Sequence, residues 1–297
     1  MTNDQRHIKG LGTALITPFD ASGKVDYKAL AQLLDTQLTG FVDYLVVLGT
    51  TGEAATLSTD EKREVRRFIV NYVNGRLPLV LGVGSNNTAA VCAELSANLG
   101  EIQDNYTAIL SVCPYYNKPN QEGLYQHFCK VAEASPVPVI LYNVPGRTGV
   151  NLLPETVMRI FNAHPDKIAG IKEASGNLEQ IKHLIELTND KRQTTNDKLL
   201  VISGDDALAC EIMQAGGAGL ISVASNAFPE DFWHIVHDKD TALQAKYEEM
   251  IKLLFAEGNP VGIKAVLAQK GIIQNYLRLP LVPASEKLQQ QILCTTP

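Results

Sequence analysis

Eight short apolar runs alternate with amphipathic stretches, and the chain then ends in a segment with helical patterns only. These observations predict an α/β fold, a (β/α)8 TIM barrel with a C-terminal helical extension. Near-continuous apolar runs are typical of parallel strands buried on both faces. Eight strands close into a barrel whose interior their side chains fill, so the barrel is favoured over an open doubly wound sheet. The runs are 12–19, 44–49, 78–84, 106–112, 138–143, 167–172, 198–204 and 218–225.

The segment 58–73 separates the second and third runs and has the pattern of an amphipathic helix. Ser58 and Glu61 have the spacing of a capping box, which predicts that the helix starts there. Its apolar residues recur at spacings of three and four, as a single buried face requires. These residues are Val65, Phe68, Ile69 and Tyr72.

After the eighth run, the alternation of strands and helices stops and helical patterns alone remain. The helical segments are 228–237, 241–257, 262–272 and 284–293. We therefore expect two parts, a catalytic barrel at 1–225 and a C-terminal helical extension at 226–297 that packs on it.

The composition is that of a folded globular protein. Of the 297 residues, 45% are apolar and 20% are charged, which excludes wholesale disorder. The formal net charge of −6 argues against a nucleic-acid partner, since such proteins carry a basic face. No run is long enough to span a bilayer, and the first residues lack the apolar segment of a secretion signal. We expect a soluble protein with neither a membrane nor a nucleic acid as partner.

The five cysteines are widely separated and contain no C-x-x-C pair. Such a set predicts reduced thiols in a cytoplasmic protein, rather than a disulfide framework or a zinc site. His234 and His237 fit a solvated helix face better than a zinc site. Because the glycine-rich phosphate and dinucleotide motifs and the nucleophile elbow are also missing, we expect no metal and no cofactor.

The active site of such a barrel lies in the loops after the C-terminal ends of the strands. The residues that follow the apolar runs are therefore the candidates for catalysis and binding. They are GTTGEAATL (49–57), CPYYNKP (113–119), YNVPGRTG (142–149), Lys172, SGDD (203–206) and SVASN (222–226).

Lys172 ends the run 167–172, an unusual place for an ammonium group. Alternation along the strand places Lys172 on the same face as Gly170, so it points into the barrel mouth and the glycine leaves room for its stem. Burial lowers the pKa of a lysine, and the neutral amine forms a Schiff base with a carbonyl substrate. The alternative is a structural lysine that reaches solvent at the rim or pairs with a carboxylate.

Further candidates stand at neighbouring strand ends. Tyr142 supplies a phenol that acts as a general acid and base, although core packing is the commoner role of such a tyrosine. Thr50 and Thr51, between glycines, form either a backbone nest for a carboxylate or an ordinary tight turn. Arg147 has the guanidinium that binds a carboxylate through two hydrogen bonds, although loop arginines are more often solvated. Each signal is modest, but together they predict a Schiff-base active site.

Five motifs resemble, in the same order, those of the dihydrodipicolinate synthase family. They are GTTGEAATLS, CPYYNKPNQEGLYQHF, LYNVPGRTG, GIKEASGNL and SGDDALA, and the likeness extends from GLGTALITPF to NYLRLPLVPAS. The resemblance implies a lyase of the class I aldolase type. Such an enzyme condenses pyruvate with L-aspartate-4-semialdehyde to 4-hydroxy-tetrahydrodipicolinate, the committed step toward diaminopimelate and lysine.

The resemblance also implies a set of catalytic roles. Lys172 would form the Schiff base with pyruvate, and Tyr142 would be the acid and base at the same carbon. Thr50 would pass protons between Tyr142 and Tyr116. Because Tyr116 reaches in from a neighbouring subunit in family members, the resemblance implies a catalytic dimer and a homotetramer of two such dimers.

Three residues would bind the substrates, according to the same resemblance. The backbone at Thr51 and Ile221 would bind pyruvate, and Arg147 would bind the carboxylate of the semialdehyde. Ile221 and Tyr116 are implied by the resemblance alone.

The main alternative is N-acetylneuraminate lyase, or another pyruvate-dependent class I aldolase, which shares the barrel, the lysine and the tyrosine. Arg147 favours the synthase, because a sugar aldehyde needs hydroxyl-binding groups in place of a carboxylate clamp. A non-enzymatic regulator or scaffold leaves the convergence of Lys172, Tyr142 and Thr50 unexplained.

Many bacterial family members bind lysine as a feedback inhibitor through two histidines and a glutamate. The corresponding positions are Thr59, Lys62 and Ala90 in this chain, whereas Asn86 and Tyr115 are kept. We therefore expect weak feedback inhibition by lysine, or none.

Overall fold

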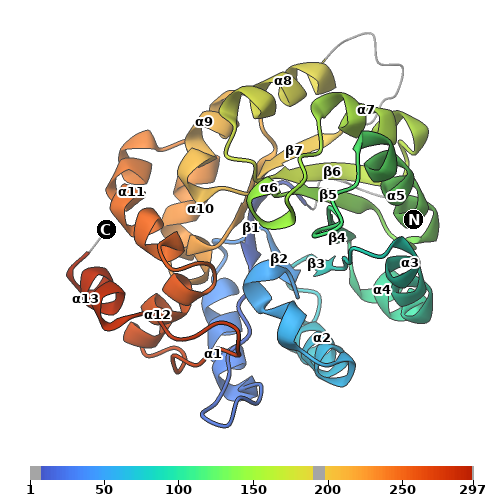
Figure 1. Cartoon of the computed structure of the whole chain (residues 1–297). Coiled ribbons are helices and arrows are strands. Elements are labelled where there is room, and N and C mark those ends of the chain that lie inside the picture. The colour runs from blue at the N-terminus through green and yellow to red at the C-terminus, as the bar shows by residue number, and fades with distance from the viewer. Residues whose placement is uncertain (1–7, 190–197, 296–297) are drawn as a thin grey trace. The chain divides into compact units, whose positions relative to one another are not determined.

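The computed structural model describes residues 8–189 and 198–295, in which a closed barrel of parallel strands runs in the order β1 to β8 (Figure 1). The predicted (β/α)8 barrel is therefore confirmed. The strands are β1 (Gly10–Ala14), β2 (Tyr44–Val47), β3 (Leu79–Gly82), β4 (Ala108–Val112), β5 (Val139–Asn143), β6 (Ile168–Glu173), β7 (Leu200–Ser203) and β8 (Gly219–Ser222).

The first strand ends earlier than the apolar run 12–19 predicts. After Ala14 the Leu15 N–H still donates to the Val46 carbonyl of β2 at 3.1 Å, while the Ala14 carbonyl and the Ile16 N–H bond to the side chain of Asn226. Asn226 Nδ2 donates to the Ala14 carbonyl at 2.8 Å, and its Oδ1 accepts from the Ile16 N–H at 3.2 Å. Because residues 15–19 stay buried without being strand, hydrophobicity alone does not mark the end of β1.

Helices separate the strands as predicted. They are α1 (Tyr27–Gln37), α2 (Thr59–Val73), α3 (Thr88–Ala97), α4 (Leu99–Asn105), α5 (Gln121–Ala134), α6 (Pro145–Thr148), α7 (Pro154–Ala163), α8 (Leu178–Asn189) and α9 (Ala209–Gln214). The predicted capping box starts α2: the Ser58 hydroxyl accepts from the Glu61 N–H at 3.2 Å, and the Glu61 carboxylate accepts from the Ser58 N–H at 2.9 Å.

Short 3-10 turns lie in several of the loops, and helices follow β8. The 3-10 turns are η2 (Thr50–Gly52), η3 (Ala54–Thr56), η4 (Asp206–Leu208) and η5 (Ala224–Asn226). The later helices are α10 (Pro229–His237), α11 (Thr241–Phe255), α12 (Val261–Gln269) and α13 (Glu286–Cys294), in the segments that the sequence predicts to be helical. No helix in this described part of the chain is long and apolar enough to cross a membrane.

Two compact units are distinguished within the chain. One is Leu79–Ile221 together with the residues before Gly10, and the other is Gly10–Pro78 with Ser222–Pro297. The first unit therefore holds β3 to β7 and most of β8, and the second holds β1, β2 and the C-terminal helices.

In the first unit, α5 packs against both α3 and α7. Phe128 of α5 and Phe161 of α7 are fully buried there. Strands β5 and β6 pair in parallel with Tyr142 opposite Lys172 and Asn143 opposite Glu173. This register brings the last residues of the two strands to the same level.

In the second unit, α10 packs on β1, and α11 contacts both α10 and α12. Phe232 of α10 is fully buried. A Cβ atom at Gly262 would stand 2.5 Å from the Leu254 carbonyl oxygen, so the glycine permits close packing of α12 on α11. The C-terminal helices are thus part of the hydrophobic core of this unit.

Candidate active site

Lys172 and Tyr142 lie beside each other at the C-terminal ends of β6 and β5. The Nζ atom of Lys172 is 4.5 Å from the centroid of the Tyr142 ring. Lys172 is 6% exposed and Tyr142 is 7% exposed. Within residues 8–189 and 198–295, no carboxylate forms an ion pair with Lys172. A lysine that reaches solvent or neutralises a carboxylate does not fit these observations, whereas a buried nucleophilic amine does.

The glycine that makes room for the lysine stem is Gly204, which follows β7. A Cβ atom at Gly204 would stand 2.9 Å from Cε and 3.1 Å from Cγ of Lys172. The prediction that Gly170 has this role is wrong. A Cβ at Gly170 would instead meet the Leu200 carbonyl oxygen at 2.6 Å, so this glycine allows β6 and β7 to approach each other.

Glu173, the residue after the lysine, is buried without a cationic partner in this part of the chain and accepts hydrogen bonds from neutral groups. Asn143 Nδ2 donates to its Oε2 at 2.9 Å, the Ser175 N–H donates to its Oε1 at 2.8 Å, and Gln180 Nε2 donates to its Oε2 at 3.3 Å. Burial raises the pKa of Glu173, although these hydrogen bonds oppose the shift. The network joins the ends of β5 and β6 next to Tyr142 and Lys172.

In the second unit, the predicted threonine turn is the 3-10 turn η2, at the C-terminal end of β2. Thr50 is exposed and Thr51 is buried, and the Thr51 hydroxyl accepts a hydrogen bond from Asn259 Nδ2 at 2.9 Å. The N–H groups of Gly52 and Glu53 bond inside the turn, to carbonyls at 3.1 Å. The N–H groups of Thr50 and Thr51, at the start of the turn, find no acceptor within it.

Arg147 and Tyr116 lie on two joined loops of the first unit. Arg147 is an exposed residue of α6, and the Tyr116 N–H donates to the carbonyl of its neighbour Thr148 at 3.3 Å. Tyr116 has a φ of 73° and is 88% exposed, so its ring packs little against its own chain. Of the predicted residues in this unit, Ile221 lies in β8 and is 1% exposed.

The two histidines predicted to lie on a helix face each contact a carboxylate. His234 Nδ1 lies 2.6 Å from Asp238, and His237 Nε2 lies 2.7 Å from Asp43, so each histidine faces a different carboxylate. In the described part of the chain, no group of three or more His, Cys, Asp and Glu side chains is arranged to hold a metal ion.

The geometry supports covalent chemistry on a carbonyl group. A buried amine attacks a carbonyl carbon when it is neutral, and the adjacent phenol supplies and accepts the protons that such an addition moves. A (β/α)8 barrel with a buried lysine and a tyrosine at its strand ends fits a protein of the class I aldolase type.

Comparisons with known proteins identify the group within this class. The model of the dihydrodipicolinate synthetase family matches residues 7–295, and the chain therefore belongs to this family. It is 47% identical to the 4-hydroxy-tetrahydrodipicolinate synthase of Azobacteroides pseudotrichonymphae over 293 residues, which are 96% of this chain and 95% of that protein. The resemblance inferred from the five motifs is thereby confirmed.

Solved structures agree with this assignment. The dihydrodipicolinate synthase of Thermotoga maritima superposes with a TM-score of 0.90 at 38% identity, over 97% of each chain. A monomeric dihydrodipicolinate synthase variant superposes with a TM-score of 0.91 at 38% identity, over 99% of this chain and 97% of that one.

Sequence reasoning missed three polar residues that contact or adjoin predicted residues within their own units. Glu173 directly follows Lys172, and a second charge at the end of an apolar run is a signal that could have identified it. Asn259 and Lys264 lie in the C-terminal helical segment, where helical periodicity gives no sign that either contacts the threonine turn. Their role emerges only from the three-dimensional contacts.

Proposed function

We propose that this chain condenses pyruvate with L-aspartate-4-semialdehyde to give 4-hydroxy-tetrahydrodipicolinate, in the diaminopimelate route to lysine. The observation that carries the proposal is the buried amine of Lys172 beside the phenol of Tyr142. Family membership supports the choice of substrates, since relatives along nearly the whole chain are named for this reaction. The alternative of N-acetylneuraminate lyase is therefore not favoured.

The reaction begins with attack of the neutral Lys172 amine on the C2 carbonyl of pyruvate. Tyr142 donates a proton to the oxygen that leaves as water, and the Schiff base forms between Nζ and C2. Loss of a proton from the methyl carbon gives an enamine, whose carbon attacks the aldehyde of the second substrate. The amine of that substrate then displaces Lys172 from C2, which closes the ring and frees the enzyme.

We assign the remaining roles as the family resemblance implies. Thr50 and Tyr116 relay protons with Tyr142, and the backbone N–H groups at Thr51 and Ile221 bind the carboxylate of pyruvate. Arg147, exposed on α6, binds the carboxylate of the semialdehyde through its guanidinium.

We further propose that a second subunit completes the site. Tyr116 is 88% exposed and has a left-handed backbone conformation. Such a conformation costs free energy, and contacts within its own chain do not offset that cost. Insertion of Tyr116 into a neighbouring subunit explains both features. The working enzyme is then a dimer, within a tetramer of two dimers in the cytoplasm.

A coupled assay tests the reaction. Purified protein receives pyruvate and aspartate-4-semialdehyde, with dihydrodipicolinate reductase and NADPH to report the product. NADPH consumption should require both substrates. If the protein instead converts N-acetylmannosamine and pyruvate and consumes no NADPH in the coupled assay, its activity is that of an N-acetylneuraminate lyase.

Borohydride trapping tests the nucleophile. Lys172→Ala should abolish the pyruvate adduct detected by mass spectrometry, because no amine remains to form it. Lys167→Ala is the matched control, since that lysine lies just before the start of the same strand and donates to the Ser135 carbonyl. An adduct that persists without Lys172 refutes the assignment.

The clamp proposed for the second substrate has a separate test. Arg147→Ala should leave the trapped pyruvate adduct unchanged, because this step does not use the arginine. The apparent affinity for the semialdehyde should fall about tenfold or more, as expected for loss of a charge-assisted hydrogen bond. An unchanged affinity contradicts the clamp.

A further inference from the structure

The C-terminal helical segment contacts the threonine turn through three residues of the second unit. Asn259 Nδ2 donates to the Thr51 hydroxyl at 2.9 Å. Lys264 of α12 forms an ion pair with the Glu53 carboxylate, and the Arg278 N–H donates to the other Glu53 oxygen at 3.2 Å. The turn that carries two of the proposed site residues is thus held by side-chain and backbone groups more than two hundred residues later in the sequence.

Glu53 occupies a backbone conformation that favours glycine. Its φ is 50° and its ψ is 35°, the left-handed region that a residue with a Cβ atom rarely adopts. Such a conformation persists only where the surroundings impose it. A glutamate stands here because its carboxylate is bound by Lys264 and by the Arg278 N–H, so the ion pair fixes the end of the turn.

Lys264 is fully buried, and its ammonium group contacts three groups of the second unit. Its Nζ donates to the Tyr276 carbonyl at 3.1 Å and lies 4.2 Å from the centroid of the Phe19 ring, in addition to the Glu53 pair. Burial lowers the pKa of Lys264 to about 8, against the opposing effect of the Glu53 charge. A buried ion pair of this type seldom stabilises a fold more than an apolar pair would, so stability alone does not explain its presence.

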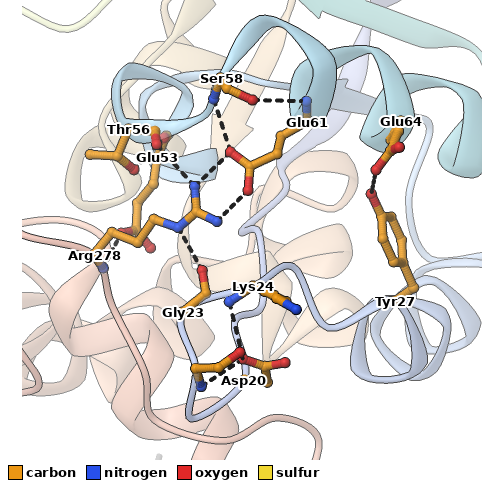
Figure 2. Close-up of polar contacts among 11 residues, drawn as sticks. Asp20, Gly23, Lys24, Tyr27, Glu53, Thr56, Ser58, Glu61, Glu64 and Arg278 are labelled. Carbon is orange, nitrogen blue, oxygen red and sulfur yellow. Dashed lines mark hydrogen bonds and ion pairs between the residues drawn. The ribbon is translucent and has the colours of Figure 1, made fainter.

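Arg278 holds the residues that lead from the turn into α2 (Figure 2). Its guanidinium donates to the Thr56 carbonyl at 2.9 Å, to the Gly23 carbonyl at 2.8 Å and to Glu61 Oε2 at 2.8 Å. Because Glu61 also completes the capping box with Ser58, this arginine ties the chain after the turn to the start of α2. Both ends of residues 53–61 are therefore held from the C-terminal segment.

We propose that Glu53 and Lys264 are positioning residues that set the geometry of the Thr50–Gly52 turn for catalysis. The inference rests on the proposed function, in which Thr50 relays protons and the Thr51 N–H binds pyruvate. In this proposal neither Glu53 nor Lys264 contacts a substrate. They act through the backbone of the turn, whose carbonyl at Gly52 is also bound by the Thr17 hydroxyl at 2.7 Å.

A double-substitution series separates positioning from stability. Lys264→Met leaves a buried carboxylate unpaired and should lower the melting temperature markedly. Glu53→Gln with Lys264→Met removes both charges, so it should restore the melting temperature to near the wild-type value. If the pair positions the turn, kcat of this double variant should nevertheless remain at least tenfold below wild type.

The kcat values are expressed per site that traps pyruvate with borohydride. This normalisation removes any fraction of protein that fails to fold. Lys252→Met, which breaks the exposed Lys252–Glu248 pair of 2.8 Å on α11, is the matched control and should leave kcat per trapped site unchanged. A double variant with wild-type kcat per trapped site overturns the proposal.

Asn259→Ala provides an independent test if the Lys264 variants do not fold. It removes the hydrogen bond to the Thr51 hydroxyl and should lower kcat per trapped site or raise KM for pyruvate several-fold. Unchanged values of both constants overturn the proposal. If the wild-type protein neither traps pyruvate nor converts the substrates, the proposed function itself is contradicted. This result is distinct from failure of the positioning proposal, in which the wild type is active and the variants match it.

Discussion

Lys172 and Tyr142 are directly paired residues of β6 and β5, and the lysine Nζ lies 4.5 Å from the centroid of the tyrosine ring. Both side chains point to the same face because residues paired across parallel strands share their orientation. The register of two strands, rather than a flexible loop, therefore sets the distance between the proposed nucleophile and its acid and base. Rigid elements are the more accurate support for a catalytic pair.

This pairing predicts the behaviour of Tyr142→Phe. The ring stays in place beside Lys172, but the proton donor is lost, so kcat should fall by about 10²–10⁴. The pyruvate adduct should still form, but more slowly. Adding borohydride at successive times and measuring the trapped adduct gives that rate. Tyr44→Phe is the matched control, because in the described structure the buried Tyr44 hydroxyl has no hydrogen-bond partner. Equal losses in both variants would mean that the Tyr142 hydroxyl has no specific role.

Gly204→Ala tests the space around the lysine stem. The added Cβ would lie 2.9 Å from Lys172 Cε and 2.6 Å from Ala174 Cβ, closer than side chains approach. The overpacking should cost about 1–3 kcal/mol of unfolding free energy. We also expect slower adduct formation, because the amine must shift, and a trapping time course measures this.

The matched control for Gly204 is Gly100→Ala in α4. A Cβ at Gly100 meets nothing within 4 Å, and alanine favours a helix, so stability should stay equal or rise. Unfolding in denaturant compares the two variants. If Gly204→Ala traps pyruvate as fast as wild type, the glycine is not needed to seat the lysine.

Much of the fold could be predicted from the sequence. Each strand is apolar on both faces, and the apolar residues of the helices recur with the helical period. Lys172 and Tyr142 were predictable for the same reason, since each ends an apolar run. Gly204 was not, because the contact of a glycine with a side chain on the neighbouring strand depends on the register between strands. The end of β1 was missed because residues 15–19 stay buried beyond the strand, and Ala14 and Ile16 bond to the side chain of Asn226, which is remote in the sequence.

The Glu61–Arg278 pair predicts a defined dependence of stability on pH. Hydrogen bonds from Arg278 lower the pKa of Glu61 to about 2, against an ordinary value of 4.5. A lowered carboxyl pKa stabilises the folded state above the unfolded pKa, and this contribution is lost as the pH falls through the folded pKa. The stabilisation by Glu61 should therefore be complete above about pH 5 and disappear toward pH 2.

Glu61→Gln should lower the unfolding free energy by about 1–3 kcal/mol at pH 7, because a charge-assisted bond and part of the capping box are weakened. The difference from wild type should shrink as the pH falls from 4.5 to 2. Denaturant unfolding at several pH values measures it. Glu248→Gln, which alters an exposed pair, should show little difference at any pH. A pH-independent difference at Glu61 would show that its charge does not matter.

The residues at three positions that the family resemblance implies for lysine binding predict insensitivity to lysine. Thr59 begins α2 and Lys62 follows in its first turn, so a cation stands where family members that bind lysine have a histidine. Ala90, in the first turn of α3, offers a methyl group in place of a carboxylate. At the positions that the resemblance implies, a positively charged effector would lose one attractive partner and meet one repulsive charge. Sub-millimolar L-lysine should therefore leave the coupled assay unaffected.

The reverse substitutions make this prediction sharper. Ala90→Glu with Lys62→His restores the carboxylate and removes the repelling charge, so inhibition by lysine should appear. The new glutamate is the third residue of α3, where an acidic side chain favours the helix N-terminus, so the variant should fold. Half-inhibition of the unmodified enzyme by sub-millimolar lysine would show that Thr59, Lys62 and Ala90 do not govern effector binding.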